Sequence, residues 1–132
     1  MPVVDASVVA EYLAGAEHAQ AARAAVLTEL EFLWAPHLVD AEVGHVLRRA
    51  AASGAIDPAR ATAALGDLVA LPIHRVPHLG LLARAFELRP NLSFYDALYV
   101  ALAERLEMPL ITFDARLLRA AQSVIEVRSL AS

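Results

Sequence analysis

The 132-residue sequence contains no cysteine, and all 11 of its basic residues are arginine, so it contains no lysine either. The lack of cysteine excludes disulfide bonds and metal sites built from thiolates. The lack of lysine excludes a P-loop nucleotide site, whose Gly-x-x-x-x-Gly-Lys motif requires one. The chain also lacks an excess of positive charge. Its net charge is −4, whereas most nucleic-acid-binding domains are basic.

Long hydrophobic runs are also absent. The longest uncharged stretches, such as 32–39 and 97–103, are far shorter than the roughly 18 residues that a membrane span needs. The first residues lack the basic and apolar regions of a secretion signal. We therefore expect a cytoplasmic protein without a membrane segment, folded as a single domain over residues 1–132. The hydrophobic fraction of 58% nevertheless predicts an apolar surface for a partner.

Short apolar runs alternate with longer segments of helical periodicity along the chain. This alternation is typical of an α/β fold with a mainly parallel sheet. The expected strands cover residues 2–4, 32–35, 73–76, 110–113 and 124–127. The expected helices cover residues 7–13, 16–31, 38–53, 57–70, 79–88, 93–107 and 115–122.

Residues that favour helix ends mark several of these boundaries. We expect Ser7 and Ser93 to cap helices through their side chains. The Asp57-Pro58 pair favours the start of another helix, with a side-chain cap and a proline in the first turn. Gly15 should close the first helix.

Four acidic residues stand where a shared site is expected. Asp5 and Asp114 directly follow two predicted strands, and ligands of open parallel sheets bind outside the carboxyl ends of the strands. Glu42 and Asp96 lie near the starts of two predicted helices, which would bring them to the same edge. Each acid taken singly also has a purely structural explanation, as a helix cap or a first-turn residue. The combination of the four indicates a site.

The surroundings of these acids favour a divalent cation. Asp96 lies in the segment 94–101, which is apolar on almost every face and where an unpaired carboxylate is costly. Carboxylates brought together also repel, at roughly 3–4 kcal/mol for each close pair, and this repulsion raises their pKa values. A cation removes that cost, and an all-oxygen set of ligands favours Mg²⁺ or Mn²⁺ over zinc.

A carboxylate-bound metal suits the hydrolysis of phosphodiesters. The metal acidifies a water molecule and offsets the charge that develops on the phosphate. Arg116 and Arg119, close behind Asp114, are candidate contacts to neighbouring phosphates. The simpler explanation of both arginines is a solvated helix face, since arginine is usually exposed.

These residues together resemble the PIN domain of VapC-type toxins. The resemblance covers essentially the whole chain and rests on the opening Val3-Val4-Asp5-Ala6-Ser7, the helix with Glu42, the run 92–103 and Thr112-Phe113-Asp114. Its most specific part is the helix that begins Tyr95-Asp96-Ala97, followed later by the Thr-x-Asp segment. The resemblance implies a PIN-like α/β/α sandwich with a central, mainly parallel sheet of about five short strands.

The resemblance also implies a function and a set of site residues. It implies a metal-dependent endoribonuclease that uses Mg²⁺ or Mn²⁺, acts on RNA, is inhibited by a cognate VapB-type antitoxin and forms a homodimer. The positions that match the four core acids are Asp5, Glu42, Asp96 and Asp114, and those that match the accompanying hydroxyl residues are Ser7 and Thr112. Many relatives carry a further acid just after the last aspartate, but Ala115 and Arg116 stand here, which leaves a second metal ion open.

Other interpretations fit parts of the sequence. A PIN-like interaction module without catalytic activity would share the fold and the acids. A receiver-like phospho-acceptor domain and a haloacid-dehalogenase-type phosphatase also place acids at strand ends, but both normally need a lysine. Glu42 and His45 have the spacing of one di-iron ligand pair, yet no second Glu-x-x-His exists, so we interpret His45 as structural or surface-exposed.

Overall fold

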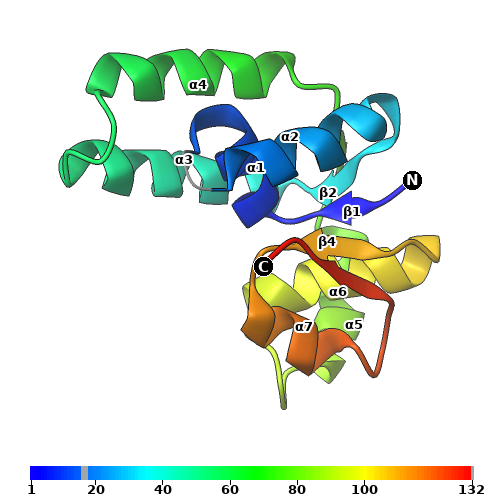
Figure 1. Cartoon of the computed structure of the whole chain (residues 1–132). Coiled ribbons are helices and arrows are strands. Elements are labelled where there is room, and N and C mark those ends of the chain that lie inside the picture. The colour runs from blue at the N-terminus through cyan, green and yellow to red at the C-terminus, as the bar shows by residue number, and fades with distance from the viewer. Residues whose placement is uncertain (16–17, 132) are drawn as a thin grey trace.

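The computed structural model describes residues 1–15 and 18–131, and a sheet of five short strands lies at its centre (Figure 1). The strands are β1 (Val3–Val4), β2 (Trp34–Pro36), β3 (His74–Val76), β4 (Leu110–Thr112) and β5 (Val127–Ser129). Their order is β3-β2-β1-β4-β5, and each neighbouring pair is parallel. The predicted parallel sheet of about five strands is confirmed.

Helices cover both faces of this sheet, as an α/β/α sandwich requires. One layer consists of α1 (Ala6–Ala14), α2 (Ala19–Thr28), α3 (Leu38–Ala52) and α4 (Pro58–Ala70). The opposite layer consists of α5 (Leu82–Glu87), α6 (Phe94–Leu106) and α7 (Ala115–Ala121). In Figure 1 the first layer lies above the strands and the second below them, and α3 with α4 extends beyond the sheet on the left. The predicted α/β/α sandwich is confirmed.

The core lies where β1 meets α6. Val3 and Val4 are fully buried because the central strand is covered on both faces, which is why its sequence is continuously apolar. Helix α6 packs against β1, β2 and β4, and its residues 97–103 are all buried. This packing holds the start of α6 and the ends of β1 and β4 in a fixed relation.

The structure corrects one helix cap and confirms two. Ser7 does not cap α1: the cap is Asp5, whose extended backbone lets its side chain accept a hydrogen bond from the backbone N–H of Val8. Asp57 caps α4 and Ser93 caps α6, as the sequence predicts. Gly15, the residue after α1, also closes this helix as expected, because its backbone N–H donates a hydrogen bond to the Glu11 carbonyl.

Several predicted boundaries were wrong by a few residues. The second helix ends at Thr28 instead of residue 31, because a 3₁₀ turn (η1, Leu30–Phe32) precedes β2; its predicted start at residue 16 lies outside the described residues. The helix predicted over 79–88 is divided into a 3₁₀ turn (η2, Leu79–Leu81) and α5.

The last strand begins at Val127, three residues later than the predicted range 124–127. The backbone N–H groups of Val124 and Ile125 both donate to the carbonyl of Ala121, so this segment is a turn at the end of α7. The strand itself is set by pairing with β4, where Leu110 lies opposite Val127 and Thr112 opposite Ser129. Among the described residues, no helix is long and apolar enough to cross a bilayer.

Candidate active site

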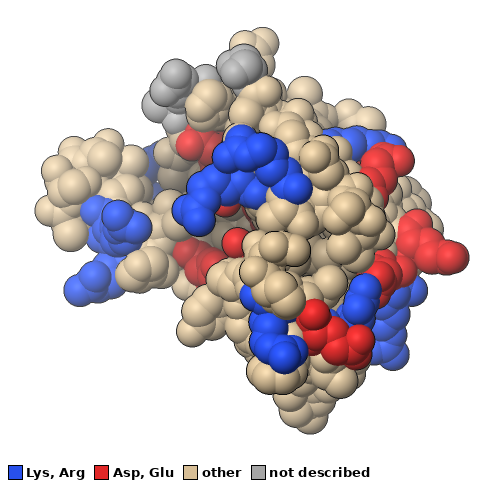
Figure 2. Space-filling view, turned by 90° about the horizontal axis from the view of Figure 1, so that it is seen from below, with Lys and Arg blue, Asp and Glu red and all other residues tan. Residues whose placement is uncertain are grey.

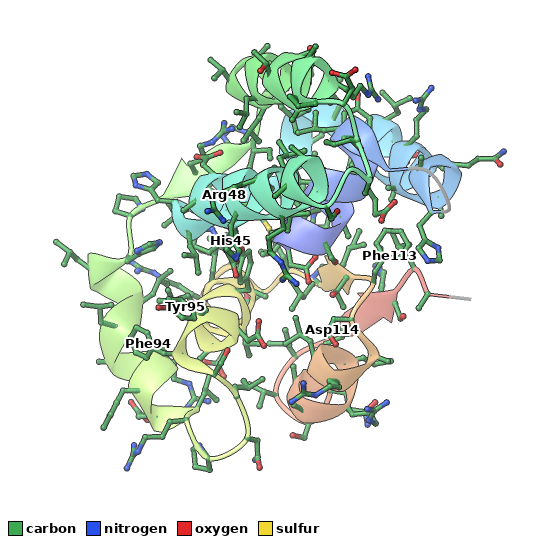
Figure 3. All side chains as sticks on the ribbon, turned by 90° about the vertical axis from the view of Figure 1, so that its left-hand side faces the viewer. His45, Arg48, Phe94, Tyr95, Phe113 and Asp114 are labelled. Carbon is green, nitrogen blue, oxygen red and sulfur yellow. The ribbon has the colours of Figure 1, made fainter. Side chains whose placement is uncertain are left out.

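A cavity of about 610 Å³ opens at the carboxyl edge of the sheet, between α1, α3 and α6. Its lining includes all four acids predicted from the sequence: Asp5, Glu42, Asp96 and Asp114. Figure 2 shows acidic side chains inside a hollow that arginine side chains border, and Figure 3 views the molecule from the side of this edge. Residues separated by up to 109 positions in the sequence (5 to 114) therefore share one cavity.

Asp5 is the most deeply buried of these acids, with 7% of its surface exposed. Its Oδ1 atom accepts hydrogen bonds from the Ser7 hydroxyl at 2.5 Å and from the Val8 backbone N–H at 3.3 Å. Its Oδ2 atom accepts a hydrogen bond from the Thr112 hydroxyl. Both carboxylate oxygens are thus held in place, and Asp5 has little freedom to rotate.

The two hydroxyl groups also connect the ends of β1 and β4. The Ser7 hydroxyl accepts a hydrogen bond from the Phe113 backbone N–H at 3.1 Å, and that of Thr112 accepts one from the Asp114 backbone N–H at 2.9 Å. Parallel pairing places Val4 opposite Ile111, so the residues that follow these two strands are neighbours. Ser7 and Thr112 therefore position two acids at once.

Burial is the main reason why the pKa of Asp5 is raised to about 6. The hydrogen bonds from Ser7, Thr112 and Val8 act in the opposite direction, and the charge of Asp96 adds a smaller increase. The pKa values of Glu42 and Asp96 are also raised, again mainly by burial. The expected increase is present, but desolvation contributes more to it than repulsion between the acids does.

Glu42 and Asp96 come from two helices that face each other across the cavity. The Tyr99 hydroxyl, one turn after Asp96 on α6, donates a hydrogen bond of 2.6 Å to Oε1 of Glu42 on α3. Asp96 is half-buried, and its backbone N–H donates to the Ser93 cap at 3.1 Å. The segment around Asp96 is less enclosed than its sequence suggests, because Phe94 and Tyr95 are 40% and 61% exposed.

Asp114 is exposed and lies at the border between two cavities. Its Oδ1 atom caps α7 by accepting hydrogen bonds from the backbone N–H groups of Arg116 and Leu117. Together with Asp96 it also lines a second cavity of about 750 Å³, which contains Arg116 and Arg119. The positive charge of Arg116 lowers the pKa of Asp96, against the larger effects of burial and of the Asp114 charge. Both predicted arginines therefore lie beside the acids.

The acids fit a divalent cation in their chemistry and their location. All four offer carboxylate oxygens to one cavity, and three of them have raised pKa values, which a bound cation would reverse. In the side-chain positions described for residues 1–15 and 18–131, no three acidic or histidine side chains converge tightly enough to hold one ion. Rotation of the more exposed carboxylates would be part of metal binding.

Three further residues with polar side chains line the cavity without having been predicted as site residues. Tyr99 is the most notable, since it is only 1% exposed and contacts a predicted acid directly. Its position three residues after Asp96 on a helix was a usable signal, because residues three apart share a face. His45 lies three residues after Glu42, and Tyr95 directly precedes Asp96. His45 is exposed, and Figure 3 shows it across the cavity from Tyr95.

Comparison with known proteins identifies the family. A model of the PIN domain matches residues 3–123 of the chain. Ribonuclease VapC1 of Mycobacterium tuberculosis is 47% identical over 130 residues, which cover 96% of this chain and 95% of that protein. The chain belongs to the PIN-domain family. Within that family it belongs to the VapC ribonucleases, as the resemblance of its motifs predicted.

Solved structures agree with this PIN-domain fold. The PAE2754 protein of Pyrobaculum aerophilum is 28% identical, with a TM-score of 0.68, and the match covers 94% of this chain and 81% of that one. VapC20 of Mycobacterium tuberculosis is 21% identical, with a TM-score of 0.73 and coverage of 97% and 99%. Because VapC20 is only 21% identical to this chain, the similarity between the two shows a shared fold alone.

Proposed function

We propose that this PIN domain is a metal-dependent endoribonuclease that acts in the cytoplasm as the toxin of a toxin–antitoxin pair. The proposed ligands of Mg²⁺ or Mn²⁺ are Asp5, Glu42, Asp96 and Asp114. The observation that carries the proposal is that these carboxylates, from four separate parts of the sequence, line one cavity. The 47% identity to a protein named as a ribonuclease supports the choice of RNA as substrate.

Each group of residues has a separate role in this proposal. A bound divalent ion would acidify a water molecule and offset negative charge on the scissile phosphate. Ser7 and Thr112 keep Asp5 in a fixed orientation, which lowers the cost of ordering the site. Arg116 and Arg119, in the adjoining cavity, would contact phosphates of the RNA on either side of the cleaved bond.

The partners that the family implies are part of the same proposal. One similar fold comes from a toxin–antitoxin complex of Klebsiella pneumoniae, with a TM-score of 0.69 and 17% identity. We propose that a VapB-type antitoxin also inhibits this chain, and that the chain forms a homodimer. Exposed apolar side chains, including Val69 and Leu79 at 84% and 83%, supply surface for such contacts.

A cleavage assay with purified protein tests the catalytic part of the proposal. The wild type should cleave RNA in Mg²⁺ or Mn²⁺ and lose this activity in EDTA, whereas Asp5→Asn and Asp96→Asn should be inactive. Arg128→Ala, which removes an exposed ion pair between Arg128 on β5 and Glu126 just before it, serves as the control and should remain active. Expression of the chain alone should arrest growth, and co-expression with a cognate antitoxin should restore it.

The assay also distinguishes an inactive PIN-like module from an enzyme. Such a module would show no metal-dependent cleavage, and its aspartate variants would behave like the wild type. Equal residual cleavage by the wild type and by both aspartate variants would point to a contaminating nuclease and would reject the proposed ligands.

A further inference from the structure

Tyr99 is a buried polar residue to which the proposed function assigns no role. It lies on α6, one turn after Asp96, and its side chain reaches the cavity that the four acids line. Only 1% of its surface is exposed, and it is the largest side chain among those that are almost fully buried. A phenol hydroxyl in such a position requires a hydrogen-bond partner, because an unpaired buried donor is costly.

The partner of this hydroxyl is one specific oxygen of a proposed metal ligand. Tyr99 donates to Oε1 of Glu42 at 2.6 Å, and the two residues lie 57 positions apart on different helices. A hydrogen bond to an ionised carboxylate is shorter and stronger than one between neutral groups. Because the buried aromatic ring is held by the core, this bond fixes the position of Oε1 of Glu42.

This contact limits how Glu42 can bind a cation. A carboxylate binds an ion through both oxygens only when both can turn toward it. The phenol proton engages Oε1, whereas Oε2 has no hydrogen bond to any residue that the structure describes. Glu42 is therefore prepared to offer a single oxygen.

We infer that Tyr99 is a positioning residue that restricts Glu42 to one metal-binding oxygen and so makes the site select Mg²⁺ or Mn²⁺ over Ca²⁺. The physical basis is the difference between these ions. Ca²⁺ takes 6–8 oxygens in flexible geometry and often binds carboxylates through both oxygens, whereas Mg²⁺ requires a strict octahedron and keeps several waters. A Glu42 carboxylate held to one oxygen leaves room for water and supplies one oxygen fewer to Ca²⁺. This inference rests on the proposed metal-dependent function.

The test is a comparison of ion affinities in wild type and in Tyr99→Phe, which removes only the hydroxyl. The affinity for Mn²⁺ is measured from the electron paramagnetic resonance signal of free Mn²⁺, and those for Mg²⁺ and Ca²⁺ by competition against it. In Tyr99→Phe the preference for Mn²⁺ over Ca²⁺ should fall about tenfold, because Glu42 gains the freedom to bind through both oxygens. Tyr95→Phe, which removes a hydroxyl from the same cavity that contacts no carboxylate, should keep the wild-type preference.

The outcomes separate this inference from the proposed function. A wild type that binds neither Mn²⁺ nor Mg²⁺ overturns the proposed function and the inference with it. A wild type that prefers Mn²⁺, with the same preference in Tyr99→Phe, overturns the inference alone. An equal loss of affinity for all three ions also overturns it, because that result indicates a merely structural role for Tyr99.

A spectroscopic measurement keeps the inference testable if Tyr99→Phe does not fold. The separation between the two carboxylate stretching bands in the infrared spectrum is larger when a carboxylate binds through one oxygen than through two. The band that Mg²⁺ shifts in the wild type, and that Glu42→Gln lacks, should have the wide separation. A narrow separation for that band would overturn the inference.

Discussion

The replacement Asp5→Asn is expected to make the metal-free protein more stable at neutral pH, although it removes a proposed metal ligand. Asp5 is 7% exposed, and burial raises its pKa to about 6 from its ordinary value of 3.8. Asparagine caps helices about as well as aspartate, so the cap of α1 is retained. The amide oxygen can accept from Ser7 and Val8 as Oδ1 does, and the amide nitrogen can donate to Thr112.

The size and sign of the effect follow from the raised pKa. Because the folded protein holds the Asp5 proton more tightly than the unfolded chain, protonation of Asp5 favours folding. This contribution is fully present below about pH 4 and is lost as the pH rises through about 6. A pKa difference of about two units corresponds to roughly 3 kcal/mol. Asp5→Asn does not ionise, so its advantage over the wild type should grow from near zero at about pH 4 to roughly 3 kcal/mol above about pH 7.

Urea denaturation in EDTA, at several pH values between about 4 and about 8, measures this difference directly. The matched control is Asp57→Asn, which changes the cap of α4 at an exposed position and should have little effect at any pH. A difference between wild type and Asp5→Asn that does not vary with pH would refute the reasoning. It would mean that burial does not disfavour the charged form of Asp5.

Three further predictions concern the metal, the RNA and the hydroxyl groups. Mg²⁺ or Mn²⁺ should raise the Tm of the wild type but raise that of Asp96→Asn much less, and equal increases in a thermal shift assay would contradict a shared site at Asp96. Arg116→Ala and Arg119→Ala should each weaken binding to single-stranded RNA and reduce its salt dependence by a slope of about 0.7, which binding isotherms at several salt concentrations would check. Thr112→Val should lower the free energy of unfolding by about 1–3 kcal/mol, as measured by urea denaturation, because it leaves a buried carboxylate oxygen and a backbone N–H without their partner.

Two of the four acids are both helix caps and candidate site residues, so the structural and the chemical explanation apply to them at the same time. Asp5 and Asp114 cap α1 and α7 through the same carboxylates that line the cavity. This dual use follows from the fold, because the carboxyl ends of parallel strands and the N-termini of the helices that follow meet at one edge. An acid at such an end stabilises its helix locally and also faces the site.

The sequence by itself determined the fold class and the acids that share one cavity. Alternating apolar runs predicted the parallel sheet, and the positions of Asp5 and Asp114 directly after strands predicted the edge at which they meet. These inferences succeeded because they depend on local order along the chain: a residue after a parallel strand is at the carboxyl edge whatever the rest of the chain does. The family motifs could also be recognised from the sequence, because each is a short run of neighbouring residues.

Only the tertiary structure decided which groups touch, how deeply they are buried and where the last strand lies. The bond from Tyr99 to Glu42 joins residues 57 positions apart, and the range of β5 is set by pairing with β4. Burial also depends on the complete packing: Asp5 is enclosed whereas Tyr95, next to Asp96 in an apolar segment, is 61% exposed. Desolvation and hydrogen bonding act through space, so neighbours in the sequence carry too little information to predict them.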